Sequence, residues 1–223
     1  MYGRHELKYY INAFDYENLR MKLKKVAKLD KNASGDVGYR IRSMYFDSYT
    51  DRAVMEKLMG VNNREKFRIR LYNHDVSFIR LEKKCKSNKL TYKDSDVITP
   101  EECELLLARK FNDFPKHDTP LKAEFYSKIR LQNLRPTNIV EYKREVYIYH
   151  AGNVRVTLDN QIRTSRNVRD FLKPSLMTVP ATQAMILEIK YDGFLPGVMR
   201  DILQINNRNQ TEFSKYVVSK FTV

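Results

Sequence analysis

Alternating charge between Arg64 and Lys86 is the feature that most restricts how this chain folds. The segment REKFRIRLY places basic residues on alternate positions, and these are Arg64, Lys66, Arg68 and Arg70. The segment FIRLEKKCK repeats the alternation with Arg80, Glu82, Lys84 and Lys86. Because successive side chains of a strand point to opposite faces, each segment predicts a strand with one charged face and one apolar face. Two such strands side by side would form a surface suited to a polyanion.

A simpler explanation is that a half-buried antiparallel sheet normally turns a polar face to water. A solvated face usually mixes charges of both signs with neutral polar residues, whereas the first segment has four cations in four places. Like charges side by side repel one another unless something negative lies among them. We therefore interpret the two segments as an anion-binding face.

Length and charge limit the class of protein further. The 223 residues suffice for one large domain, and with no internal repeat or boundary we expect a single domain over 1–223. The formal net charge of +14 favours an acidic partner, such as nucleic acid, an anionic membrane surface or a phosphorylated small molecule. No apolar run is long enough to cross a membrane, and the start does not resemble a signal peptide. We expect a soluble, cytoplasmic protein.

Strand patterns dominate the chain, and helices lie between them. Besides the two basic strands, we expect strands at 4–11, 39–47, 89–93, 138–150, 153–159 and 185–192. We expect helices at 15–28, 100–110, 121–134, 196–205 and 211–221, the first capped by Asp15 and the second by Thr99, with a loop at 165–182. The turn at Gly152 and Asn153 predicts a hairpin between its two flanking strands.

Six of these strands have one apolar and one charged face. The economical arrangement is an α+β fold, mainly antiparallel, in which eight strands form a barrel with a charged lumen and helices pack outside. Burying so many cations without a partner would be prohibitive, but a wet lumen that holds an anionic chain avoids this cost. Arginines on its walls would bind phosphates bidentately.

Three acids stand in similar places on these strands. Glu6, Glu82 and Glu188 each precede a lysine by two residues on the same strand face. Ion pairing explains any one of them, but three suggest one or two ligands for a hard metal, Mg²⁺ or Mn²⁺. The sequence lacks a P-loop, an RNA-binding signature and a helix-turn-helix pattern, and its four histidines are scattered.

Nine short segments, in order, resemble one family. They are RHELKY, SMYFD, EKLMG, REKFRIRLY, LEKKCK, YKREVY, VRVTLD, LEIKYD and FSKY. The chain resembles the catalytic domain of the vacuolar transporter chaperone (VTC) polyphosphate polymerases, and most of all their bacterial single-domain relatives, within the CYTH-like triphosphate tunnel metalloenzyme superfamily. The resemblance implies an antiparallel tunnel of about eight strands. It also implies transfer of the ATP γ-phosphoryl group to polyphosphate with Mn²⁺ or Mg²⁺.

The resemblance also implies roles for individual residues. The catalytic cations would be Lys8, Arg68, Arg70, Arg144, Arg155 and Lys190. Further phosphate ligands or lining residues would be Lys57, Arg64, Lys66, Lys84, Lys86, Lys93, Tyr142, Ser214 and Lys215. Glu188 matches the metal-binding glutamate of the family, and we expect Glu6 to be a second metal ligand.

Two positions depart from the wider pattern. The superfamily opens with Glu-x-Glu-x-Lys, but this chain has Arg4 in place of the first glutamate. The polymerase branch resembles it in having a basic residue there. Some relatives carry a basic residue two positions before the Ser-Lys pair, where this chain has Glu212. The first departure disfavours a two-metal hydrolase.

The hypothesis from the sequence is therefore a polyphosphate polymerase. A tripolyphosphatase or nucleoside triphosphatase on the same fold, with Glu6 activating water, is the first alternative. A non-catalytic module that binds polyphosphate or RNA is the second. The expected partners are ATP and inorganic polyphosphate or pyrophosphate. Nucleic acid is not expected, while a membrane partner and the oligomeric state are left open.

Overall fold

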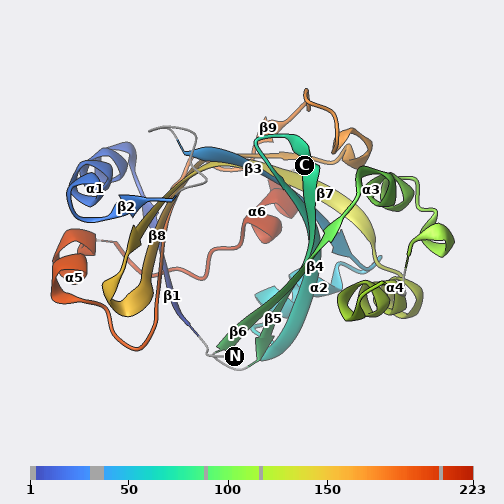
Figure 1. The fold of residues 1–223 in the computed structure, drawn as a ribbon, viewed down its shortest axis with the longest axis horizontal. Coiled ribbons are helices and arrows are strands. Elements are labelled where there is room, and N and C mark those ends of the chain that lie inside the picture. Colours follow the sequence, from blue (N-terminus) through green and yellow to red (C-terminus); the bar gives the residue numbers. More distant parts are fainter. Residues whose placement is uncertain (1–3, 31–37, 88–89, 116–117, 206–207, 223) are drawn as a thin grey trace. The chain divides into compact units, whose positions relative to one another are not determined.

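The protein is a mixed α+β structure with mostly antiparallel strands and six α-helices (Figure 1). The computed structural model describes residues 4–30, 38–87, 90–115, 118–205 and 208–222. The strands are β1 (His5–Ile11), β2 (Lys28–Leu29), β3 (Tyr39–Asp47), β4 (Asn63–Tyr72), β5 (Asp75–Ser87), β6 (Leu90–Ile98), β7 (Arg135–Tyr149), β8 (Val154–Ser165), β9 (Val179–Pro180) and β10 (Met185–Tyr191). The helices are α1 (Ala13–Val26), α2 (Arg52–Leu58), α3 (Pro100–Leu107), α4 (Pro120–Gln132), α5 (Gly197–Leu203) and α6 (Lys215–Thr222).

The chain forms two compact units. Unit 1 consists of Met1–Arg40, Tyr142–Ile162 and Thr182–Ser214. Unit 2 consists of Ile41–Glu141, Arg163–Ala181 and Lys215–Val223. The expected single domain and the closure of the strands into a tunnel stay predictions.

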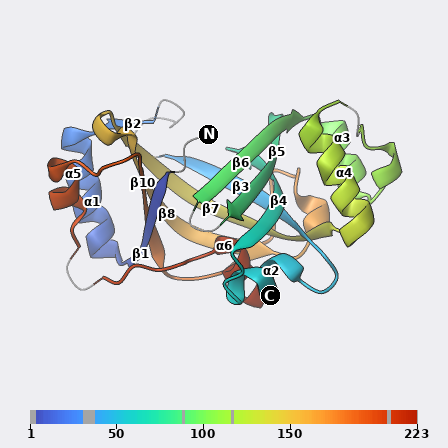
Figure 2. The same ribbon diagram turned by 90° about the horizontal axis from the view of Figure 1, so that it is seen from below.

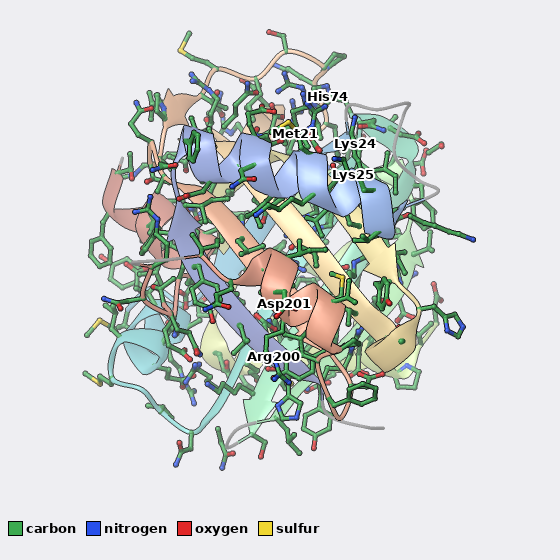
Figure 3. The ribbon with its side chains drawn as sticks, turned by 90° about the vertical axis from the view of Figure 1, so that its left-hand side faces the viewer. Met21, Lys24, Lys25, His74, Arg200 and Asp201 are labelled. Atoms are coloured by element: carbon green, nitrogen blue, oxygen red, sulfur yellow. The ribbon has the colours of Figure 1, made fainter. Side chains whose placement is uncertain are left out.

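Unit 1 is an antiparallel sheet with two helices on its apolar face. Its strands follow the order β1, β10, β8 and the second part of β7, with β2 paired to that part of β7. Leu19 and Leu23 of α1 and Met199 of α5 pack against Val156 and Leu187 of the sheet. Figure 3 shows α1 and α5 side by side over these strands, with the exposed Met21, Lys24, Lys25, Arg200 and Asp201 on the two helices. Alternation along the strands leaves the opposite face polar.

Unit 2 is built on the antiparallel strands β3, β4, β5 and β6. Figure 2 shows α3 and α4 side by side next to these strands. Their side chains, led by Leu106 and Phe125, pack against the apolar face formed by residues such as Phe67, Ile69 and Leu81. The register places Arg64 opposite Lys86, and the other basic positions of β4 also lie opposite charged positions of β5. These charged side chains therefore share the face that points away from α3 and α4.

The sequence predicted the eight long strands, but several ends and caps differ. Strand β6 extends to Ile98, well beyond the predicted end at Lys93. Helix α1 begins after Asn12 rather than Asp15, because the two residues form a reciprocal capping box in which Asp15 is the third helical residue. The last helix begins at Lys215 rather than Thr211.

Helix α2 was not predicted. It has only seven residues, and Asp51 before it makes no side-chain cap. The carboxylate of Asp47, at the end of β3, accepts a hydrogen bond from the backbone N–H of Ala53 at 2.9 Å and supplies part of the missing cap. None of the helices in the described part of the chain is both long and apolar enough to span a bilayer.

The aromatic centre of unit 2 gives a test of this packing. Phe125 is fully buried, and its ring centroid lies 4.9 Å from that of Phe46, 5.1 Å from Phe67 and 6.0 Å from Phe114. We expect Phe125→Ala to lower the free energy of unfolding by about 3–5 kcal/mol, as measured by urea denaturation. Leu131→Ala, on the exposed side of the same helix, is the control and should change it by less than about 0.5 kcal/mol. Equal effects of the two substitutions would contradict this core.

Candidate functional site

The charged face of β4, β5 and β6 is strongly basic. Strand register places eight cations on it: Arg64, Lys66, Arg68, Arg70, Arg80, Lys84, Lys86 and Lys93. Among the described positions of these three strands, Glu82 is the single carboxylate on the same face. We call these nine residues the unit 2 cationic face. Its excess positive charge is what a polyanion would neutralise.

Glu82 holds the centre of the unit 2 cationic face together. Its side chain is 1% exposed, and its Oε2 lies 2.6 Å from Nε of Arg68 and 3.6 Å from Nη1 of Arg70. Its other oxygen pairs with Lys93. Burial alone would raise the pKa of Glu82, but the three cations outweigh it and the pKa is lowered. One ionised carboxylate therefore positions three cations whose mutual repulsion would otherwise separate them.

Lys93 is the partner of Glu82 whose own pKa its surroundings lower. Burial lowers its pKa, Arg68 and Arg70 lower it further, and Glu82 opposes both effects without cancelling them. The lowered pKa means that the surroundings of Lys93 disfavour its positive charge. An added phosphate would reverse this balance, because a nearby anion favours the charged amine.

Helix α6 packs against unit 2 on the side of the unit 2 cationic face. Tyr45 faces Arg68 in the register, and the ring of Tyr216 stacks on it with centroids 4.6 Å apart. The Tyr216 hydroxyl donates to Oδ2 of Asp47 at 2.6 Å, and burial and this carboxylate raise the pKa of Tyr216. These contacts fix the start of α6, where Lys215 lies.

Unit 1 carries a second polar face, in which acids and bases alternate. Lys8 of β1 lies opposite Glu188 of β10, and Glu6 lies opposite Lys190. Along each strand, Nζ of Lys8 is 2.8 Å from Oε1 of Glu6, and Nζ of Lys190 is 2.7 Å from Oε1 of Glu188. Burial would lower the pKa of Lys8, but the carboxylates of Glu188 and Glu6 prevail and raise it. Lys8 is thus held fully charged.

Two arginines extend this face. Nε of Arg144 lies 2.6 Å from Oδ1 of Asp159, and its Nη2 donates to the other oxygen at 2.7 Å. Burial opposes the charge of Arg144, yet Asp159 keeps its pKa well above the ordinary value. Arg155 pairs with Asp30 at 3.1 Å. Among the described residues of the unit 1 strands and their ion pairs, four cations (Lys8, Arg144, Arg155 and Lys190) therefore face four acids (Glu6, Asp30, Asp159 and Glu188).

The acids of unit 1 can be tested as metal ligands. No group of three or more His, Cys, Asp or Glu side chains suited to a metal occurs among the residues that the structure describes. Glu6 and Glu188 nevertheless occupy diagonal positions on neighbouring strands and both present carboxylates to the same face. Mg²⁺ is commonly bound by one or two carboxylates, with waters and substrate phosphates completing its shell. The donor set therefore fits a divalent ion that arrives with a phosphate substrate.

The predicted site residues divide between the two units. In unit 2, Arg68, Arg70 and Lys93 gather on Glu82, with Arg64, Lys66, Lys84 and Lys86 on the same face. In unit 1, Tyr142 joins the polar face, where it is buried with the Arg144 guanidinium 5.2 Å from its ring centroid. Lys57 lies on α2, Lys215 is the first residue of α6, and Ser214 directly precedes it, so none of the three lies on a strand face. Arg4 pairs with Asp192 at 2.9 Å.

Some residues of the site were missed by sequence reasoning. Asp159, which holds Arg144, had no role assigned. Ion pairing was expected for Glu82, but not its three cationic partners. Ser43 was also missed, although its hydroxyl accepts a hydrogen bond from Nε of Arg70 at 3.1 Å. Alternation in YRIRSMYFD places Ser43 and Tyr45 on one face of β3, and this pattern could have indicated Ser43 from the sequence.

The chain belongs to the VTC domain family, whose model matches residues 3–221. The match therefore spans segments of both units. A comparison with curated proteins found no match.

Solved structures resemble this chain at low sequence identity. A Bacillus halodurans protein described as a candidate adenylate cyclase matches with a TM-score of 0.53 and 14% identity, over 85% of this chain and 82% of that one. A Pyrococcus horikoshii protein has a TM-score of 0.49 and 14% identity, over 96% and 97% of the two chains. A Vibrio parahaemolyticus protein, also described as a candidate adenylate cyclase, has a TM-score of 0.44 and 11% identity, over 85% and 75%. The first likeness supports the fold alone.

The central role of Glu82 leads to a stability prediction. Its pKa is lowered in the folded protein, so its charge adds stability above the pKa of an unfolded glutamate, about 4.3, and this gain is lost as the pH falls below that value. We expect Glu82→Gln to lower the free energy of unfolding at neutral pH by about 3 kcal/mol, because removing one partner leaves buried charges uncompensated. The difference from wild type should stay constant from about pH 6 to 8 and shrink below about pH 4.

Urea denaturation at each pH measures this difference. Glu104→Gln, at an exposed position of α3, is the matched control and should have little effect at any pH. A difference for Glu82→Gln that persists or grows in acid would contradict the assignment of Glu82 as an ionised counterion.

Proposed function

We propose that this protein is a polyphosphate polymerase, which transfers the γ-phosphoryl group of ATP to the end of a polyphosphate chain. The observation that carries the proposal is the unit 2 cationic face, where eight cations surround one buried carboxylate. Membership of the VTC domain family supports the same conclusion. A surface with this excess of positive charge suits a substrate that carries charge on every phosphate.

The cations would bind and orient the phosphates. Arg68 and Arg70 are fixed by Glu82, so little side-chain freedom is lost when they meet phosphate oxygens. Phosphoryl transfer needs mainly positioning and stabilisation of charge on the transferred group. Guanidinium and ammonium groups held in place before reaction supply that stabilisation.

The reaction requires no nucleophilic side chain. A terminal oxygen of the acceptor chain forms a bond to the γ-phosphorus of ATP, and the bond from that phosphorus to the bridging β–γ oxygen breaks. ADP leaves, and the acceptor is longer by one phosphate. Both the attacking and leaving groups are phosphate oxygens, so the protein's task is to hold two anions close together against their repulsion.

Glu188 and Glu6 would hold a divalent cation, Mn²⁺ or Mg²⁺. When bound, such an ion would supply positive charge that offsets the charge developing during transfer. Lys8 and Lys190 now pair with these two carboxylates. When the carboxylates are engaged elsewhere, the two amines become available to phosphate oxygens. The pairing of each of these lysines with a carboxylate on the unit 1 polar face suits this exchange of partners.

The direct test is incubation of the purified protein with ATP and Mn²⁺, followed by sizing of the products on a urea gel. We expect a ladder of long polyphosphate chains together with ADP. Free phosphate without a ladder would contradict the polymerase and favour a triphosphatase. Binding of polyphosphate with a steep salt dependence but no turnover of ATP would favour a non-catalytic module.

A substitution at the proposed metal site separates binding from catalysis. We expect Glu188→Gln to reduce ATP turnover by at least about 100-fold, because the amide is a poorer ligand for a hard cation. Affinity for tripolyphosphate measured without metal should change less than about threefold, since the cations that bind phosphate remain. The control is Glu104→Gln, which should leave both quantities unchanged. Turnover by Glu188→Gln at the wild-type rate would overturn the metal assignment.

A further inference from the structure

Unit 2 contains a pocket of about 400 Å³ beside the unit 2 cationic face. Its walls come from the end of β3, α2, the start of β4, the end of β5 and the end of α4, and Figure 2 shows α2 beside β4. Arg64, Lys66 and Lys86 line this pocket and also belong to the unit 2 cationic face. The volume is within the range of small-molecule binding sites. We call it the hairpin-end pocket.

The hairpin-end pocket reaches both faces of the sheet. Arg64, Lys66 and Lys86 lie on the cationic face, whereas Phe67 and Cys85 occupy alternate positions that point to the opposite face. Both sets line one cavity because it lies at the open end of the β4–β5 hairpin, where Asn63 pairs with Ser87. A chain bound along the cationic face could therefore continue around the hairpin end into this pocket.

The charge of the hairpin-end pocket favours an anion. Five cations and three acids line it, which leaves an excess of two positive charges: Arg52, Arg64, Lys66, Lys86 and Lys128 against Asp47, Glu56 and Glu65.

Each of these acids already has a cationic or hydrogen-bonding partner in the protein. Oε1 of Glu56 accepts from Nε of Arg52 at 2.6 Å. Glu65 pairs with Lys128 and with Lys83, and the pKa of Glu65 is lowered by these lysines against the effect of burial. Asp47 accepts hydrogen bonds from the Tyr216 hydroxyl and from the backbone N–H groups of Ser48 and Ala53. The acids are therefore held in place, and the pocket keeps its excess positive charge.

We propose that the hairpin-end pocket is a second phosphate-binding site, which takes the part of a polyphosphate chain remote from the reacting phosphate. This inference rests on the proposed function, since it assumes that the chain lying on the cationic face is polyphosphate. A site of this kind retains the growing chain between successive additions. It would increase product length without taking part in the transfer itself.

Cys85 provides a direct report of occupancy. It is partly exposed in the pocket, and its side chain points away from the face that carries Lys84 and Lys86. Polyphosphate bound on the cationic face alone would leave Cys85 open to a small neutral reagent, whereas a chain in the pocket would cover it. Burial raises the pKa of the Cys85 thiol, so labelling with iodoacetamide is best followed at mildly alkaline pH. The buried Cys103 is an internal control that should stay unlabelled.

The test compares labelling rates at Cys85, measured by mass spectrometry, with and without saturating long-chain polyphosphate. In the wild type we expect polyphosphate to slow labelling at least about fivefold. In the double variant Arg52→Gln with Lys128→Gln, which removes two cations found only in the pocket, protection should fall below about twofold. The matched control, Arg130→Gln with Lys173→Gln, removes two exposed cations of unit 2 outside the pocket and should protect like the wild type.

Three results would overturn the inference, and the first two differ in what they say about the proposed function. If titration shows that polyphosphate binds the wild type while Cys85 reacts at an unchanged rate, the hairpin-end pocket is not a phosphate site and the polymerase proposal stands. If polyphosphate does not bind at all, both proposals fail. Protection that survives in the Arg52 and Lys128 double variant also contradicts a role for the pocket cations.

Discussion

Repulsion between neighbouring cations is the constraint on which this structure depends, and buried carboxylates are its solution. In unit 2, Glu82 binds Arg68, Arg70 and Lys93, and in unit 1, Asp159 holds Arg144 through both of its oxygens. Removing one partner of such a buried group is costly, because the remaining charges lose both water and counterion. These carboxylates therefore fix the geometry of the cations before any substrate is present.

The two units use charge differently. On the polar face of unit 1, each described lysine and arginine pairs with a carboxylate of the protein. The unit 2 cationic face has a large positive excess, and its only carboxylate on β4–β6, among the described residues, is Glu82. Under the proposed function, the balanced face would exchange partners with a metal and phosphates, whereas the unbalanced face would retain a polyanion.

The sequence predicted the strands well because alternation of charged and apolar residues is a local signal. It did not predict α2, whose cap is supplied in part by Asp47 of the preceding strand, or the true start of α1 at Asn12. It placed the strand cations on the correct faces, but it did not predict which cations pair with Glu82 and Asp159. Which cation meets which carboxylate depends on strand register and on side-chain reach, and neither is encoded in a single segment.

The most direct test of the account is a crystal structure of the protein with tripolyphosphate and Mn²⁺, in which anomalous scattering locates the metal. The account predicts phosphates in contact with Arg68, Arg70 and Lys93, and an anomalous peak at the carboxylate of Glu188. Phosphates bound away from the unit 2 cationic face, or a metal ion held elsewhere in the chain, would contradict it.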